Sequence, residues 1–147
     1  MKLTVMEKIN AIRDKQQRLA LNSWAQSNFI GSIIAGTGFG KSRVGVLAIG
    51  HALKDGGNAL LLVPTVQLQD QFLEEFDKWG VDSTNVEIMC YQSAYKLKDE
   101  EYSIVVCDEI HLGLSPKYRQ FFENNAYEKL LCVTATLPEE PEYKVKL

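Results

Sequence analysis

A glycine-rich stretch that ends in a lysine and a serine combines residue types that can hold a chain of phosphates. It reads AGTGFGKS from Ala35 to Ser42. Glycines let backbone amides wrap around phosphate oxygens, and the amino end of a following helix adds positive potential. The Lys41 ammonium would contact the β- and γ-phosphates, and the Ser42 hydroxyl would bind Mg²⁺. The residues expected to bind the nucleotide here are Gly36, Thr37, Gly38, Phe39, Gly40, Lys41 and Ser42.

This stretch fits the phosphate-loop pattern G-x-x-x-x-G-K-[ST] at every fixed position except the first, where Ala35 replaces glycine. The departure is mild because the last glycine, the lysine and the serine are intact. A dinucleotide-binding loop is excluded, since the glycines run G-x-G-x-G and end in Lys-Ser. The alternative is a glycine-rich loop that precedes Lys-Ser by chance and does not bind phosphate. The pattern requires a strand before it and a helix after it, and both are expected at these positions.

Two adjacent carboxylates, Asp108 and Glu109, end an apolar run later in the chain. Asp108 would hold the hydrated Mg²⁺, and Glu109 would orient the attacking water and accept its proton. A solvated acidic turn is the alternative, which the upstream phosphate loop disfavours. Ligands of parallel sheets bind at the carboxyl ends of the strands. We therefore expect Lys41, Asp108 and Glu109 to form one catalytic group, with Ser42 and Asp108 at the metal.

Apolar runs that alternate with amphipathic stretches supply the elements that position these residues. The expected strands cover residues 29–35, 59–63, 86–90, 103–107 and 129–134. The expected helices cover residues 5–26, 41–53, 65–79, 92–98 and 116–124. Continuously apolar strands between helices indicate an α/β fold, with three layers and a parallel central sheet that is covered on both faces.

The composition indicates which broad class of protein this chain belongs to. The chain has 147 residues, of which 46% are hydrophobic and 24% charged, as in a globular domain. No apolar run reaches membrane-spanning length, and the first residues do not resemble a signal peptide, so we expect no membrane partner.

Cys90, Cys107 and Cys132 lie in apolar runs without metal or disulfide spacing, and we expect them to be buried and reduced. The net charge of −3 argues against a broadly electropositive surface, but a local groove could still bind nucleic acid.

Several of these strings together resemble a known family. Asp-Glu-x-His at residues 108–111, downstream of AGTGFGKS, resembles motifs II and I of superfamily 2 helicases and translocases. The Pro64-Thr65 pair resembles motif Ia, and Thr134-Ala135-Thr136 resembles motif III. The chain is most similar to the branch with XPB-like repair helicases and the motor subunits of type I and type III restriction enzymes. The resemblance extends from about residue 12 to residue 137.

The resemblance implies the first RecA-like, P-loop NTPase lobe of a DNA helicase or translocase, with ATP and Mg²⁺ as cofactors. Pro64 and Thr65 would meet the nucleic-acid backbone, as would Gln92 and Ser93, which resemble motif Ib. His111 would couple the ATP site to motif III through Thr134 or Thr136, although a buried structural histidine is the alternative.

An adenine-reading element is implied upstream of the phosphate loop. Arg13-Asp14-Lys15-Gln16 resembles the family's R-x-x-Q element, whose glutamine reads adenine through its two-sided amide. Gln16 is expected to recognise adenine, and Gln17 is the other candidate. The alternative is that this glutamine faces solvent and does not contact the nucleotide. Lys15 stands where the family often has an aromatic residue, which weakens any case for stacking on the base.

The expected organisation is a helical segment at residues 1–28, the RecA-like core at 29–137 and a tail or linker at 138–147. A second RecA-like lobe in cis would supply motifs IV to VI and an arginine finger, so the isolated lobe should be a weak ATP hydrolase. We expect a nucleic-acid partner, with DNA favoured over RNA, in the reducing interior of a bacterial or phage-infected cell or in a nucleus. The alternatives are a regulatory or decoy half-motor that does not translocate and an unrelated P-loop enzyme such as a kinase.

Overall fold

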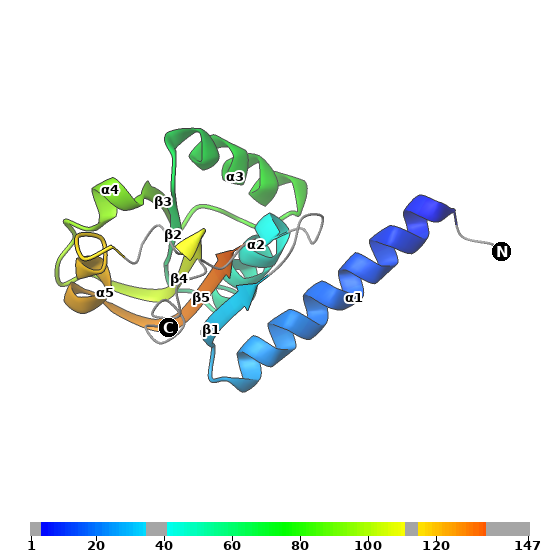
Figure 1. The fold of residues 1–147 in the computed structure, drawn as a ribbon, viewed down its shortest axis with the longest axis horizontal. Coiled ribbons are helices and arrows are strands. Elements are labelled where there is room, and N and C mark those ends of the chain that lie inside the picture. The colour runs from blue at the N-terminus through cyan, green and yellow to red at the C-terminus, as the bar shows by residue number, and fades with distance from the viewer. Residues whose placement is uncertain (1–3, 35–40, 111–114, 135–147) are drawn as a thin grey trace.

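A parallel sheet of five strands forms the centre of the molecule (Figure 1). The computed structural model describes residues 4–34, 41–110 and 115–134. The strands lie in the order β1-β5-β4-β2-β3, and every neighbouring pair is parallel. Their bounds are β1 Ile30–Ile34, β2 Ala59–Val63, β3 Val86–Cys90, β4 Glu101–Asp108 and β5 Ala126–Thr134. The predicted three-layer α/β fold is confirmed.

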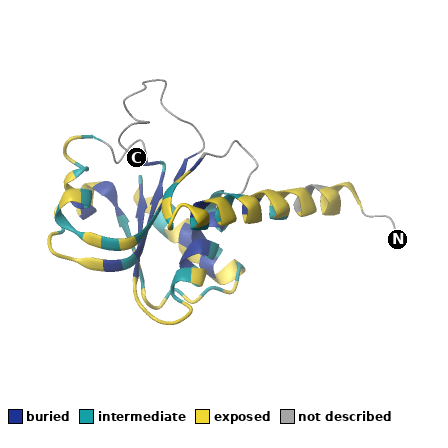
Figure 2. Ribbon diagram, turned by 90° about the horizontal axis from the view of Figure 1, so that it is seen from below, coloured by how far each residue is buried: buried dark blue, intermediate teal, exposed yellow. Residues whose placement is uncertain are grey.

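Helices cover both faces of this sheet. Their bounds are α1 Val5–Gln26, α2 Lys41–Ala52, α3 Val66–Lys78, α4 Tyr91–Ala94 and α5 Gln120–Asn124. Alternate residues of β2 point to opposite sides, so Leu61 joins the core under α2 and α3 while Leu60 joins the core under α4 and α5. All five residues of β2 are buried, which explains its uninterrupted apolar sequence (Figure 2).

The long helix α1 is held to the sheet near its carboxyl end. Trp24 is buried there, packs edge-on against Phe29, and donates from Nε1 to the carbonyl of Leu130 at 2.8 Å. At its other end, Thr4 and Glu7 form a reciprocal capping box. The amino-terminal half extends beyond the sheet (Figure 1). The carboxyl half of α1 lies next to α2, since Leu21 and Trp24 line a cavity together with Leu47 of α2.

Two predicted helices are shorter than expected, and two strands are longer. The helix expected at 92–98 is α4, which ends at Ala94, because the chain must turn back into β4 and Asp99 adopts a φ of 59°. Residues 116–119 form turns ahead of α5. Strands β4 and β5 begin earlier than predicted because Glu101 pairs with Ala126, which extends the ladder over polar residues. Sheet pairing here overrides the apolar pattern of the sequence.

The three cysteines are free and buried, as predicted. Cys90 ends β3, whereas Cys107 and Cys132 are partners in the β4–β5 ladder. Among the described residues, no helix is both long enough and apolar enough to cross a membrane.

Candidate nucleotide-binding and catalytic site

Lys41, Asp108 and Glu109 meet at the carboxyl edge of the sheet. Lys41 is the first residue of α2, and Asp108 is the last residue of β4. The Lys41 ammonium lies 3.2 Å from Asp108 Oδ1 and also contacts Glu109 Oε1. Lys41 and Glu109, which are 68 positions apart in the sequence, are thus in direct contact, as expected for loops at the carboxyl ends of parallel strands.

Backbone geometry directs the Glu109 carboxylate into this group. Glu109 adopts a φ of 52°, a left-handed conformation that costs a residue with a Cβ on the order of 1 kcal/mol. Its N–H donates to the carbonyl of Val133 at 2.8 Å, and its Oε2 accepts from the Thr134 hydroxyl at 3.1 Å. Both contacts come from β5, so the motif that contains Thr134 holds the expected base directly.

The site shifts the pKa of two of its groups. Burial of Lys41 lowers its pKa, but the hydrogen bond to Glu109 and the charge of Asp108 outweigh burial, so the pKa is raised above 10.5. Burial raises the pKa of Asp108 above 3.8, although Lys41 opposes this rise. The carboxylate expected at Mg²⁺ is therefore desolvated, and the Lys41 ammonium partly offsets the cost of burying its charge.

Tyr91 is a site residue that the sequence did not reveal. It is buried at the start of α4, and its hydroxyl donates to the carbonyl of Asp108 at 2.8 Å. This bond connects the end of β3 to the end of β4, which are separated in the sheet by β2. An aromatic residue directly after a strand is too common to predict such a contact. Tyr91 nevertheless fixes the backbone from which Asp108 and Glu109 project.

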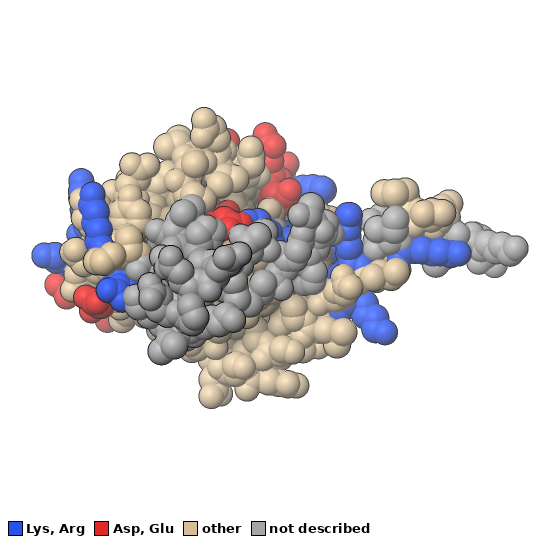
Figure 3. All heavy atoms as spheres, in the orientation of Figure 1, with Lys and Arg blue, Asp and Glu red and all other residues tan. Residues whose placement is uncertain are grey.

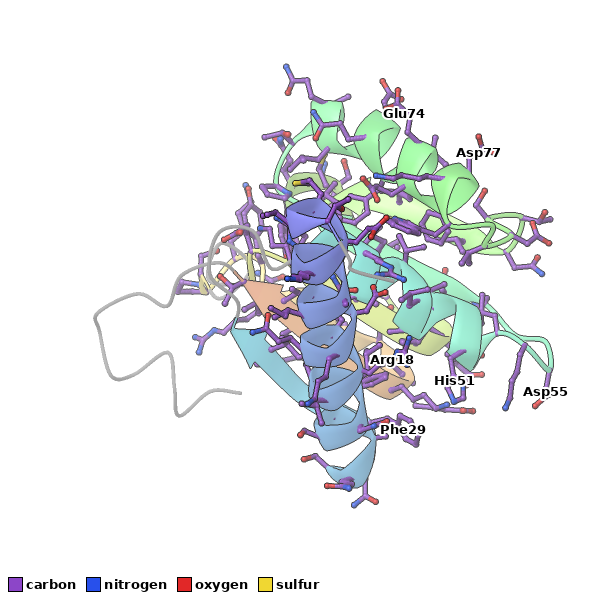
Figure 4. All side chains as sticks on the ribbon, turned by 90° about the vertical axis from the view of Figure 1, so that its right-hand side faces the viewer. Arg18, Phe29, His51, Asp55, Glu74 and Asp77 are labelled. Carbon is purple, nitrogen blue, oxygen red and sulfur yellow. The ribbon has the colours of Figure 1, made fainter. Side chains whose placement is uncertain are left out.

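A cavity of about 480 Å³ lies beside the start of α2. Residues of α1, α2 and the end of α3 line it, namely Arg13, Asp14, Gln17, Ser42, Arg43, Glu75, Lys78 and Trp79. The side of the molecule that holds these helices faces the viewer in Figure 4, where Glu74 and Asp77 project outward from α3 and the exposed His51 lies on α2. The cavity adjoins Ser42, so it is placed to receive the part of a nucleotide beyond its phosphates.

The two candidate adenine readers occupy different environments. Gln16 is exposed and does not line the cavity, whereas Gln17 is only 3% exposed and does. Gln17 thus lines the cavity and Gln16 does not, and the identity of the glutamine that contacts adenine stays a prediction.

Arg43 and Trp79 form the wall of the cavity. The Arg43 guanidinium lies 4.3 Å from the centre of the Trp79 ring and pairs with Asp14. Trp79 Nε1 donates to Glu75 Oε2 at 2.7 Å. Trp79 is thus part of the cavity lining.

The residues expected to contact nucleic acid lie at the same edge of the sheet. Pro64 and the exposed Thr65 follow β2, while Gln92 and Ser93 are exposed on α4 just after β3. The structure thus brings the two pairs to neighbouring strand ends. The expected residues Gly36, Thr37, Gly38, Phe39, Gly40, His111 and Thr136, and the tail at 138–147, lie outside the described residues.

A comparison with protein families decides the assignment. The family model described as DEAD/DEAH box helicase matches residues 14–103, which is more than half of the chain. The chain belongs to the DEAD/DEAH box helicase family. The match includes AGTGFGKS and every cavity-lining residue except Arg13, and it stops before Asp108. The arrangement of the sheet and the converging motifs agree with the first RecA-like lobe of a superfamily 2 helicase.

Solved helicase-type structures share the fold of this helicase-family chain. The SWI2/SNF2 ATPase core of Sulfolobus solfataricus, in complex with double-stranded DNA, aligns with a TM-score of 0.66 and 15% identity over 86% of the chain. The Hef helicase domain of Pyrococcus furiosus aligns with a TM-score of 0.62 and 18% identity over 92%. The ATP-dependent type ISP restriction-modification enzyme LlaBIII, bound to DNA, aligns with a TM-score of 0.58 and 18% identity over 92%. The chain covers 31%, 33% and 13% of these three proteins, respectively.

Proposed function

We propose that this chain is the ATP-binding and hydrolysing lobe of a DNA helicase or translocase. The convergence of Lys41, Asp108 and Glu109 at one sheet edge is the observation that carries the proposal. A lysine after a phosphate loop, facing two carboxylates at a strand end, is the arrangement that phosphoryl transfer to water requires. Thr134 supports it by holding the Glu109 carboxylate.

The residues present fit Mg²⁺-ATP. Asp108 and Ser42 offer the carboxylate and hydroxyl oxygens that Mg²⁺ prefers, and this ion is usually held by few protein ligands together with water and substrate phosphates. When bound, Mg²⁺ would neutralise the phosphate charge. The cavity beside Ser42 has room for a base and ribose, and Gln17 in its wall carries an amide that can both donate to and accept from adenine.

The roles of the side chains follow from this arrangement. Lys41 would exchange its carboxylate partners for the β- and γ-phosphates, which keeps its charge paired. Glu109, released from Lys41 but still hydrogen-bonded by Thr134, would accept the proton of the attacking water. Tyr91 would keep the backbone of Asp108 in place throughout.

Partners follow from the same proposal. The SWI2/SNF2 core and the type ISP enzyme are described as DNA complexes, which supports DNA as the partner of this chain. The chain covers 33% or less of each of those two proteins and of Hef, which supports a second RecA-like lobe in cis. Thr65, Gln92 and Ser93 would meet the DNA backbone. The intracellular, reducing location stays a prediction.

The test is to titrate the purified chain with a fluorescent ATP analogue, with and without Mg²⁺, and to measure hydrolysis and strand displacement. We expect Mg²⁺-dependent binding, slow hydrolysis and no displacement, because translocation needs the closure of two lobes. Absence of Mg²⁺-dependent binding would refute the ATP site. Robust displacement by the monomer would refute the single-lobe proposal. If a longer chain that includes the second lobe hydrolyses ATP but does not move on DNA, the chain is a regulatory half-motor.

A further inference from the structure

A cluster of tyrosines and lysines lies outside the catalytic group, on the side of the sheet covered by α4 and α5. The Tyr91 and Tyr118 rings stack with their centres 6.2 Å apart, and the centres of the Tyr95 and Tyr118 rings are 5.8 Å apart. The Lys117 ammonium lies 4.7 Å from the centre of the Tyr95 ring, and the Lys96 ammonium lies 5.8 Å from it. Tyr95, Lys96, Lys117 and Tyr118 are called the tyrosine–lysine patch below.

The charge of this patch is not neutralised locally. Both lysines are exposed, and neither forms an ion pair with a carboxylate in the part of the chain that the structure describes. An acidic run, Asp99–Glu101, lies where β4 begins, at the amino edge of the sheet. Glu123 is exposed on α5. Lysine and arginine side chains lie at this end of the molecule, with acidic side chains beside them (Figure 3).

The aromatic rings give the lysines defined positions. A lysine on an exposed surface normally samples many rotamers, and a phosphate contact must overcome that entropy. A tyrosine ring attracts an ammonium through its quadrupole without removing its charge or its donors. Lys117 and Lys96 are therefore held in place while their ammonium groups remain available to an anion.

The patch continues a row of strand-end residues. Gln92 and Ser93 lie on α4, which ends one residue before Tyr95. Tyr118 packs on Tyr91, whose hydroxyl donates to the carbonyl at the end of β4. Arg119 follows directly, with its Nε buried and without a hydrogen-bond partner among the described residues. A strand that runs past Thr65 and Ser93 at the carboxyl edge would therefore come next to the patch.

We propose that the tyrosine–lysine patch binds the phosphate backbone of a nucleic-acid strand and extends the contact surface beyond the ends of β2 and β3. This rests on the proposed function, which supplies the nucleic acid. Lys96 and Lys117 each neutralise one phosphate, and the tyrosine rings hold the two ammonium groups in position. Because these contacts are to backbone, they add affinity and salt dependence but little base preference. In a protein with a net charge of −3, this patch supplies local positive charge.

The salt dependence of oligonucleotide binding tests this inference quantitatively. Each neutralised phosphate contributes about 0.7 to the slope of log affinity against log salt for a single strand. Replacing both lysines by glutamine (K96Q/K117Q) should therefore reduce the slope by about 1.4 for a fluorescently labelled single strand. The matched control is K8Q/K54Q, which removes the same charge from two exposed lysines elsewhere, on α1 and after α2. The control should keep the wild-type slope.

A second variant tests the role of the rings, and ATP binding separates the two proposals. Tyr95→Leu keeps apolar volume but removes the ring, so it should weaken oligonucleotide binding while both lysines remain. Mg²⁺-ATP affinity should be unchanged in every variant. If K96Q/K117Q keeps the wild-type slope, or if the wild-type chain binds no oligonucleotide, the patch proposal is wrong even though ATP binding stands. A protein partner would then be the better assignment for the patch. Loss of ATP binding by the wild-type chain would instead refute the proposed function.

Discussion

The Lys41 ammonium lies 3.2 Å from the Asp108 carboxylate and contacts the Glu109 carboxylate as well. The cation expected to bind phosphate is thus paired with the two groups expected to bind Mg²⁺ and activate water. Binding of Mg²⁺-ATP would separate these charges and give each a new partner. The three residues therefore act as one electrostatic unit, and a substitution in one of them changes the environment of the others.

Replacement of Lys41 by alanine should weaken Mg²⁺-ATP binding by roughly 10- to 100-fold, since a hydrogen bond to a charged group contributes about 1.5–3 kcal/mol. The fold should persist, because Lys41 is not part of either hydrophobic core. Nucleotide titration and thermal melting of the same sample measure both effects. Lys54→Ala, at an exposed lysine after α2, is the control and should bind ATP like the wild type. Wild-type affinity in Lys41→Ala would contradict the phosphate-loop assignment.

Glu109→Gln should leave ATP binding largely intact and remove the residual hydrolysis. The amide keeps the shape of the side chain and can still accept a hydrogen bond from Thr134, but it cannot accept the proton of water. Single-turnover hydrolysis, measured beside nucleotide affinity, separates the two steps. A variant that hydrolyses ATP at the wild-type rate would show that another group is the base.

The stability of the nucleotide-free chain should depend on pH through Asp108. Its folded-state pKa is raised above 3.8, mainly by burial. The protonated acid therefore stabilises the fold below pH 3.8, and this contribution is lost as the pH rises through the raised pKa. Asp108→Asn does not titrate, so its melting temperature should improve relative to the wild type as the pH rises from about 4 to 8. If the melting temperature of Asp108→Asn instead improves relative to the wild type as the pH falls, Asp108 is not desolvated.

The positions of Lys41, Asp108 and Glu109 could be predicted from sequence because one rule applies to all parallel sheets. Loops after the strands lie at one edge, so AGTGFGKS and Asp-Glu had to meet there. The left-handed φ of Glu109 and the Tyr91 hydrogen bond could not be predicted, since each depends on how neighbouring strands align. The acceptor of the Tyr91 hydrogen bond is a backbone carbonyl, and every residue has one, so the sequence does not indicate which one accepts.

Helical phase explains why Gln17 rather than Gln16 lines the cavity. Seven residues make about two helical turns, so Gln17 lies on the same face of α1 as Trp24. Trp24 is buried against the sheet, and its indole N–H is bonded to Leu130. Gln16 is rotated by about 100° from that face and is exposed. With Trp24 as the anchor of α1, helical phase therefore places Gln17, and not Gln16, toward the cavity.

Tyr91→Phe should weaken catalysis more than ATP binding. The substitution leaves the Asp108 carbonyl without the hydroxyl donor at 2.8 Å, and an unsatisfied buried acceptor costs about 1–3 kcal/mol. The phenyl ring should still stack on Tyr118, so packing is preserved. Denaturant unfolding gives the stability loss, and the ratio of hydrolysis rate to ATP affinity gives the catalytic effect. Equal hydrolysis at saturating ATP in both proteins would mean that Tyr91 is only a core residue.

Gln17→Ala should reduce the preference of the chain for ATP over GTP, whereas Gln16→Ala should not. Gln17 is buried in the cavity wall beside Ser42, and its amide can donate to one ring position of adenine and accept from another. Guanine presents a different pattern of donors and acceptors, so loss of the amide should weaken ATP binding and leave GTP binding nearly unchanged. A lost neutral hydrogen bond contributes about 0.5–1.5 kcal/mol, so two of them predict roughly a 5- to 100-fold loss in ATP affinity. Competition of both nucleotides against a fluorescent analogue measures the ratio of ATP affinity to GTP affinity directly.

Gln16→Ala removes the same atoms one residue away, from an exposed position on the same helix, and it controls for any change in α1. If Gln16→Ala lowers the ATP preference and Gln17→Ala does not, α1 must rotate when nucleotide binds, and the original assignment of Gln16 would be correct.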